Sequence, residues 1–287
     1  MDYFFKYTSV NEQDKAWQLY LNVAGKYRYL PHDEYPSKTH PLSYQLYWEK
    51  GRVLHEYQII YITEGRGIFE TNKSRYQISP GSIIIVRKGQ WHRYRPLKEF
   101  GWTENYIGFD GDLADFFLQK QEVLCDLDVV ELGEQETLID TFYKIFDLVK
   151  NENPCFQQVA SGLIIKLLGY ILALTNNKSF AGKDSEKIIK EICYHIREHV
   201  EDEFNFEMLT QDYDISCSHL RKIFKQYTGK SPHQYYLDMK IIRAKELLSN
   251  TRMSIKEISF QLGFESIHYF SRLFKKKEGQ SPSSFRG

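Results

Sequence analysis

Residues 224–236 read FKQYTGKSPHQYY and residues 274–286 read FKKKEGQSPSSFR, so the chain carries one pattern twice. Each fragment runs Phe-Lys, three residues, Gly, one residue, Ser-Pro, two residues and an aromatic residue. Gly commonly ends a helix, and Ser followed by Pro commonly begins one. Each copy therefore predicts the end of one helix and the start of the next.

The similarity between the copies continues upstream, where each predicts a short helix, a turn and a second helix. This is the order of a helix-turn-helix motif. Asp214 and Gly263 stand in the two turns, and both residue types tolerate a left-handed backbone. Ser231 is expected to cap a following helix, and the segment from Ser254 to Glu257 has the form of a capping box. The predicted helices of the two copies span about 206–213, 217–227, 254–262 and 267–277.

The second helix of each copy has one apolar face and one face rich in hydrogen-bond donors. The apolar residues are Leu220, Ile223, Phe224 and Tyr227 in copy one, and Phe270, Leu273 and Phe274 in copy two. The opposite faces carry Ser218, Arg221, Lys222 and Lys225, and His268, Ser271, Arg272 and Lys275. Arg and Lys can donate to guanine edges or to phosphates, so these faces have the chemistry that a DNA major groove requires. An ordinary solvated helix face is the alternative, and the repetition of the motif weighs against it.

The charge distribution also singles out this end of the chain. From Ser216 onward there are 14 Lys plus Arg against 5 Asp plus Glu, which gives +9, although the whole chain has a formal net charge of zero. The remaining residues therefore carry −9. A basic region in a neutral protein indicates a polyanionic partner for that region alone.

The first half of the chain predicts a different architecture. From about residue 53 to 109, short β-branched and aromatic runs alternate with Gly-containing turns, which is typical of a small barrel or sandwich. After Gly111, apolar residues recur at helical spacing up to about Leu174. We expect these helices to pack on the strands and to offer a surface for dimerisation. Residues 176–184 are polar and aperiodic, which predicts a linker.

Composition favours a cytoplasmic protein. Cysteines 125, 155, 193 and 217 are too scattered for a Cys-x-x-Cys site and too few for a disulfide framework, so we expect reduced thiols. The N-terminus lacks a signal-peptide pattern, and the longest apolar run has Lys166 inside it, so no membrane segment is expected.

Residues 185–287 resemble the DNA-binding domain of the AraC-type (AraC/XylS) transcription regulators. The resemblance rests on IKEISFQLGFESIHYFSRLFKKKEGQSPSSFR and on ISCSHLRKIFKQYTGKSPHQYYLDMKIIRAKELL. It implies two helix-turn-helix units joined by a long helix, here about 233–248. Thr210 and Ser259 stand where the family often has Ala, and both are small enough for a close helix crossing. Ile267 and Tyr269 suit thymine methyl or phosphate contact better than donor readout, so copy two is expected to read less sequence. The implied and derived DNA-binding residues together are Ser218, Arg221, Lys222, Lys225, Ile267, His268, Tyr269, Arg272 and Lys275.

The first half resembles the cupin-like sensor domain of the same family. The segment PGSIIIVRKGQWHRY matches the second half of the cupin pattern at Gly81, Gly89 and His92, with Arg87 where Pro is usual. A metal-dependent cupin enzyme is the competing hypothesis. Such enzymes hold a metal with several His and a Glu, whereas only His92 is in register here, so we predict no enzyme activity, no metal and no other cofactor.

Aromatic and polar residues cluster in the strand region and favour a carbohydrate effector. Aromatic faces can stack on a sugar ring, and Arg, Glu and His can bind its hydroxyls; arabinose-type members of the family likewise use a Trp, a Tyr and an Arg. The alternative is that about half of these aromatic residues are ordinary core. Strand alternation places Trp91 and Arg93 opposite to His92 and Tyr94. The predicted ligand-binding residues are Arg52, His92, Tyr94, Trp102 and Glu104.

The sequence thus predicts a two-domain α+β protein. Residues 1–175 form a cupin-like β-barrel with flanking helices for ligand binding and dimerisation, 176–184 a linker, and 185–287 an all-α DNA-binding domain. The predicted function is a sequence-specific transcription regulator that binds promoter DNA as a homodimer and responds to a small metabolite, for which a sugar is the favoured candidate. RNA polymerase is a further candidate partner. A ligand-independent regulator whose barrel is only a scaffold stays open. Activation and repression are not distinguished.

Overall fold

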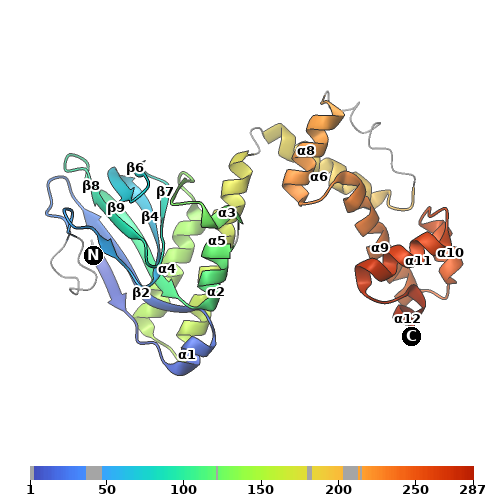
Figure 1. The fold of residues 1–287 in the computed structure, drawn as a ribbon, viewed down its shortest axis with the longest axis horizontal. Coiled ribbons are helices and arrows are strands. Elements are labelled where there is room, and N and C mark those ends of the chain that lie inside the picture. The colour runs from blue at the N-terminus through green and yellow to red at the C-terminus, as the bar shows by residue number, and fades with distance from the viewer. Residues whose placement is uncertain (1–2, 37–46, 121, 180–182, 203–212, 214) are drawn as a thin grey trace. The chain divides into compact units, whose positions relative to one another are not determined.

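The computed structural model describes residues 3–36, 47–120, 122–179, 183–202, 213 and 215–287. The chain divides into two compact units, Met1–Asn177 and Lys178–Gly287, which are described separately below. The first unit is rich in strands and carries flanking helices, and the described part of the second is helical (Figure 1). The predicted fold class, α+β with an all-α C-terminal domain, is confirmed.

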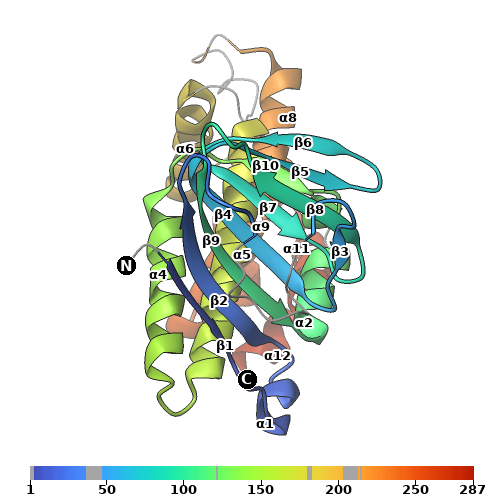
Figure 2. The same cartoon turned by 90° about the vertical axis from the view of Figure 1, so that its left-hand side faces the viewer.

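The first unit contains two antiparallel sheets. The larger has the strand order β1-β2-β9-β4-β7-β10, and the smaller has the order β3-β8-β5-β6 (Figure 2). The strands are β1 (Tyr3–Tyr7), β2 (Tyr20–Tyr29), β3 (Arg52–Val53), β4 (Tyr57–Gly65), β5 (Gly67–Thr71), β6 (Arg75–Ile78), β7 (Ser82–Val86), β8 (Trp91–Pro96), β9 (Trp102–Asp110) and β10 (Val129–Glu131). The helical segments are α1 (Glu12–Ala16), α2 (Asp112–Asp115), a π-helical turn (Phe116–Lys120), α3 (Glu122–Cys125), α4 (Glu136–Asn151) and α5 (Phe156–Ser179).

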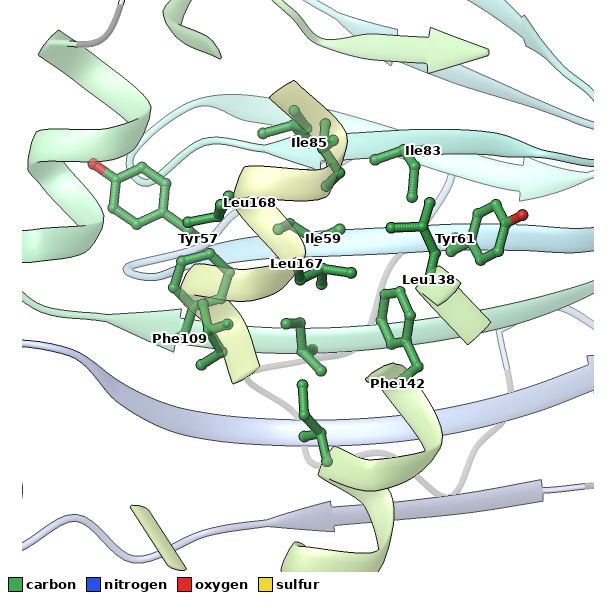
Figure 3. Packing of buried hydrophobic residues seen from close by; sticks show 14 of the residues in the cluster. Tyr57, Ile59, Tyr61, Ile83, Ile85, Phe109, Leu138, Phe142, Leu167 and Leu168 are labelled. Atoms are coloured by element: carbon green, nitrogen blue, oxygen red, sulfur yellow. The ribbon is translucent and has the colours of Figure 1, made fainter. Parts of the chain in front are cut away.

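Strand alternation divides the side chains of the larger sheet between two hydrophobic cores. On β4, Ile59 and Tyr61 face α4 and α5, whereas Ile60 and Ile62 face the smaller sheet. Figure 3 shows the first core, in which side chains of β4, β7 and β9 meet Leu138, Phe142, Leu167 and Leu168 of the two helices. Each fully buried Leu, Ile or Phe contributes roughly 1.5–3 kcal/mol relative to an exposed one, so this layer fixes the helices on the sheet.

The second core lies between the two sheets, in a space called here the barrel interior. It includes Phe69 and Tyr94 from the smaller sheet and Ile60, Ile84 and Trp102 from the larger. This interior also holds the polar residues of the candidate ligand site.

Helix α5 differs from the sequence expectation in two respects. It extends through Ser179, and α6 (Lys183–Glu198) begins at Lys183, so the described residues of the predicted linker are helical. Polar residues such as Asn, Lys and Ser lower helix propensity only modestly, which is why composition did not exclude a helix there. In addition, the stretch Phe156–Asn176 is long and apolar enough to cross a membrane by length and composition alone. Its Ile164, Leu167 and Ile171 are fully buried against the sheet, as expected for the core helix of a globular domain.

The described part of the second unit consists of helices, of which α9 is the longest. They are α6, α8 (Cys217–Thr228), α9 (Pro232–Asn250), α10 (Ile255–Gln261), α11 (Ile267–Glu278) and α12 (Pro282–Arg286). One hydrophobic cluster joins α6, α8 and the first turns of α9, and another joins the rest of α9 to α10, α11 and α12. The predicted first helix of copy one, with Thr210, and the turn residue Asp214 lie outside the described residues. The other predicted helices are confirmed, including the joining helix α9.

Candidate nucleic-acid interface and ligand site

The repeated fragments form the same local structure in both copies. Gly229 and Gly279 follow α8 and α11 with φ of 74° and 79°, and their N–H groups donate to the carbonyls of Lys225 and Lys275. Two residues further on, Ser231 and Ser281 cap the next helices, each followed by a buried Pro at the first helical position. A left-handed Gly and a Ser-Pro start were the signals in the sequence, so the predicted helix boundaries are confirmed.

The two second helices bury the predicted apolar faces. Leu220 and Phe224 of α8, and Phe270 and Phe274 of α11, are fully buried. Burial of these residues fixes the rotation of each helix about its axis, and therefore determines which residues face solvent. Ile223 is buried as well, whereas Leu273 and Tyr227 are half-buried.

The predicted DNA-binding residues lie on the opposite faces. Eight of the nine are exposed, namely Ser218, Arg221, Lys222, Lys225, His268, Tyr269, Arg272 and Lys275, and Ile267 is half-buried. The ring of Tyr269 lies 6.0 Å from the ring of Phe264, which holds Tyr269 against the body of the unit. Ser259 of α10 is fully buried, as a residue at a close helix crossing would be. Both exposed faces can offer Arg or Lys donors to phosphates and base edges.

Arg52 lies at the centre of the polar residues of the barrel interior. Its guanidinium donates from Nη2 to the Tyr94 hydroxyl at 2.7 Å and to Gln58 Oε1 at 3.3 Å, and from Nε to His92 Nε2 at 3.2 Å. Burial, and then the nearby Arg52 charge, lower the pKa of His92 to about 3. The imidazole is therefore neutral at physiological pH. Since Nε2 accepts from Arg52, the proton resides on Nδ1, which donates to the Gln90 carbonyl at 3.0 Å.

Trp102 and Glu104 add two buried polar groups from the same face of β9. Indole Nε1 of Trp102 and Oε2 of Glu104 are buried, and within the described part of the chain neither makes a hydrogen bond of good geometry, although the indole N–H is close enough to the Glu104 carboxyl to lower its pKa slightly. Burial raises the pKa of Glu104 to about 8, although the Arg52 charge opposes this shift. A buried polar group that lacks a partner costs free energy, so both atoms are placed as if to meet a ligand or a bound water.

Aromatic rings surround these groups. The ring centroids of Tyr94 and Trp102 are 6.0 Å apart, and Tyr35 lies 6.1 Å from Trp102 and 6.3 Å from Tyr94. Tyr35 also lines a cavity of about 1130 Å³ whose other walls include Leu30, Tyr47 and Arg95. The structure thus brings all five predicted ligand-binding residues into one interior. Their role in binding stays a prediction.

The alternation expected along β8 is present. His92 and Tyr94 are buried in the interior, whereas Trp91 and Arg93 are half-buried on the other face. There, Arg93 donates to Glu70 Oε2 at 2.6 Å and lies 4.3 Å from the ring centroid of Trp48. These outward residues fix the segment that precedes β3, and β3 carries Arg52.

Sequence reasoning missed Glu56 and Tyr35. Glu56 is buried and accepts from Asn22 Nδ2 at 2.7 Å and from Gln58 Nε2 at 3.1 Å, which ties it to the Arg52 network. The two-residue spacing of Glu56 and Gln58 was a signal that could have revealed their shared inward face. Tyr35 lies outside every strand, so no periodicity could have found it.

Arg87, which replaces the usual Pro of the cupin pattern, has a structural role. Its Nη1 donates to the carbonyl of Leu118 at 2.7 Å, and its Nη2 donates to those of Leu124 and Leu127, both at 2.8 Å. It also forms an ion pair with Asp128 at 3.6 Å. Arg87 therefore holds the irregular segment between β9 and β10 against the end of β7.

Comparison with known proteins matches both units to families. A family described as the AraC-like ligand binding domain matches residues 42–168, and a helix-turn-helix domain family matches residues 209–287. The chain belongs to the AraC family of transcription regulators. The regulators in this family are DNA-binding proteins with an N-terminal ligand-binding domain, and they are not enzymes. The same holds for this chain, and the resemblance stated from the sequence is confirmed.

The relatives are similar over most of their length. An arabinose operon regulatory protein of Salmonella typhimurium is 29% identical over 77% of this chain and 80% of its own. The MmsAB operon regulatory protein of Pseudomonas aeruginosa is 26% identical over 86% of this chain and 85% of its own. Among solved structures, the DNA-binding domain of AdpA in complex with a target DNA is 26% identical over 34% of this chain and 88% of that one, with a TM-score of 0.33.

Proposed function

We propose that this AraC-family regulator binds promoter DNA through α8 and α11, with Ser218, Arg221 and Lys222 on the first helix and His268 and Arg272 on the second nearest the bases. The observation that carries the proposal is the repetition, since two helices with buried aromatic faces present exposed basic faces in one unit. Two such helices can occupy successive major grooves about 34 Å apart. In copy two, Ile267 and Tyr269 suit contact with a thymine methyl or a phosphate better than donor readout, so copy one is expected to read more of the sequence.

The test replaces one arginine on each helix. Arg221→Ala and Arg272→Ala should each weaken binding by about 1–3 kcal/mol where the residue contacts a base. Binding would be measured by fluorescence anisotropy, with double-stranded DNA that the full-length chain has selected from a random pool. Arg66→Ala is the matched control, because Arg66 is an exposed arginine of the first unit. Unchanged affinity in both helix variants would refute the assignment.

We further propose that the barrel interior binds a carbohydrate. The support is chemical, because the interior combines the rings of Tyr35, Tyr94 and Trp102 with the Arg52 donors and the buried polar atoms of Trp102 and Glu104. Hydroxyl groups both donate and accept, so they can satisfy an indole N–H and a carboxyl group together. Several relatives are named as regulators of sugar operons, including the arabinose operon and the lactose operon.

Calorimetric titration with pentoses, hexoses and oligosaccharides tests this proposal. One class should release heat on binding to the wild-type protein. Trp102→Phe, which keeps a ring and removes the indole N–H, should weaken that binding by about fivefold, since a hydrogen bond contributes roughly 1 kcal/mol. Trp17→Phe is the control, because Trp17 is 55% exposed. No binding across the panel would favour the alternative in which the barrel is only a scaffold.

We propose that the protein acts in the cytoplasm as a homodimer assembled through α5. Val159 and Tyr170 of this helix are 52% and 37% exposed, and Leu163 and Leu174, on the same side, are half-buried. An exposed apolar stripe at helical spacing is typical of a helix–helix interface. Effector binding would then favour one arrangement of the two DNA-binding units over another, which requires different effector affinity in the two states. RNA polymerase is a further partner to be tested.

A further inference from the structure

Among the residues that the structure describes, Lys240 is the one lysine in the buried class, with 4% of its surface exposed. It lies in the middle of α9, the helix that joins the two copies of the motif. Lysine is almost never fully buried unless its charge is compensated. Its position therefore requires an electrostatic explanation.

The surroundings of Lys240 belong to both copies. Its Nζ lies 4.4 Å from the ring centroid of Tyr236, which packs in the cluster of α6 and α8. The same atom lies 5.1 Å from the ring centroid of Phe264, which packs against Phe270 of α11. An ammonium group is attracted to the face of an aromatic ring, and more strongly when water is excluded. Lys240 thus connects the cluster that carries α8 with the cluster that carries α11.

The turns that follow α10 and α6 lie close to Lys240. A Cβ placed on Gly263, just after α10, would lie 3.2 Å from Lys240 Nζ and 3.5 Å from the carbonyl oxygen of Glu201, three residues after the end of α6. The C-terminal end of a helix carries partial negative charge on its carbonyls, which favours a cation. The Glu201 carboxylate is shared in turn, since it accepts from Arg243 of α9 at 3.0 Å and from Gln261 of α10 at 3.1 Å.

Asp238, two residues before Lys240, makes a second connection between the copies. It pairs with Lys230, which follows α8, at 2.5 Å, and with Lys277 of α11 at 2.7 Å. Burial alone would raise the pKa of Asp238, but the hydrogen bonds from these two lysines keep it below its ordinary value. The carboxylate is therefore ionised and holds one lysine from each copy.

We infer that Lys240, supported by Asp238, is a positioning residue that sets the separation and relative rotation of α8 and α11, and hence the spacing of half-sites that the protein accepts. The inference rests on the proposal that both helices contact DNA. Inserting one base pair between two half-sites shifts them by about 3.4 Å and rotates them by about 35°. If the contacts of Lys240 hold α8 and α11 rigidly, the two helices cannot adjust to the inserted base pair. Removal of the Lys240 charge should loosen these contacts and allow the adjustment.

The experiment compares spacing dependence in the full-length protein. The probe is the selected DNA site, together with derivatives that carry one or two extra base pairs between the regions protected by the two copies. The wild-type protein should lose at least about tenfold in affinity on the two-base-pair insertion, comparable to a mismatched base pair. Lys240→Met keeps the aliphatic stem and removes the charge, so its loss should be less than threefold.

Lys190→Met is the matched control, because it removes the same charge from an exposed lysine of α6. Asp238→Asn is the second test variant. It replaces Lys240→Met as the deciding variant if circular dichroism shows that Lys240→Met is not folded. Wild-type spacing dependence in a folded Lys240→Met protein, or in Asp238→Asn when it is the deciding variant, would overturn the inference. Protection of a single half-site by the wild-type protein would instead contradict the proposed use of both helices, and the inference with it.

Discussion

Glu104 gives the barrel interior a pH dependence that can be measured. Its pKa is about 8 in the folded protein and near the ordinary value of 4.5 when unfolded, so the folded state retains a proton that the unfolded state releases between these values. The free energy of unfolding due to this group therefore falls as pH rises from about 4.5 to about 8. Glu104→Gln removes that fall, because glutamine resembles the protonated acid and does not titrate.

The measurement is the urea midpoint of unfolding at pH 5 and at pH 8.5. The variant and the wild-type protein should be similar at pH 5, and the variant should be the more stable of the two at pH 8.5. Glu131→Gln is the control, since Glu131 is exposed on β10. Parallel pH dependence of wild type and Glu104→Gln would show that Glu104 is ionised in the folded protein throughout this range.

Single residues also mark the limit of sequence reasoning. His92 and Tyr94 could be assigned to the interior because strand alternation is a local rule. Arg87 could not, because its partners, the carbonyls of Leu118, Leu124 and Leu127, come from a segment with a π-helical turn that no period describes. The residues next to Arg87 in the sequence carry no information about where the distant segment 118–127 runs in the fold.

At the level of elements, the two glycines that follow α8 and α11 are expected to contribute equally to stability. No atom lies within 4 Å of a Cβ added at Gly229 or Gly279, so the cost of an alanine there is the positive φ alone. Each substitution should lower the free energy of unfolding by about 1 kcal/mol. Gly162→Ala is the control, because Gly162 is exposed within α5 and also has open space, and it should raise stability by up to about 1 kcal/mol.

Differential scanning calorimetry of the full chain measures these changes. A Gly279→Ala protein as stable as wild type would mean that the helix can end without a left-handed residue.

Helix ends were the best-predicted feature of the sequence, because Gly, Ser and Pro act through their own backbone geometry. The linker was predicted less well, because it rested on composition, and polar residues at 176–179 and 183–184 are in fact helical.

For the whole molecule, the sequence revealed two units because strand-like runs occur only in its first half, whereas the repeated helix-turn-helix pattern and the excess of basic residues are confined to the C-terminal part. The repeat and the resemblance together were sufficient for the DNA-binding unit, apart from the part of copy one outside the described residues. The candidate ligand site could be predicted only in part. Its five predicted residues do meet in one interior, but Glu56 and Tyr35 complete it through contacts that depend on the closed fold.

The paired lysines of Asp238 have a consequence for any salt titration of DNA binding. Such a titration is usually converted into a number of phosphates neutralised, because each contact releases condensed counterions. Here added salt also screens Lys230 and Lys277, whose side chains are 52% and 37% exposed, from the carboxylate that links the two copies. Weakening of these two ion pairs lowers the affinity for a site with two half-sites, although the number of contacts between the protein and DNA phosphates is unchanged. The slope of affinity against salt therefore sets an upper limit on the phosphate count, and the excess should disappear in Asp238→Asn.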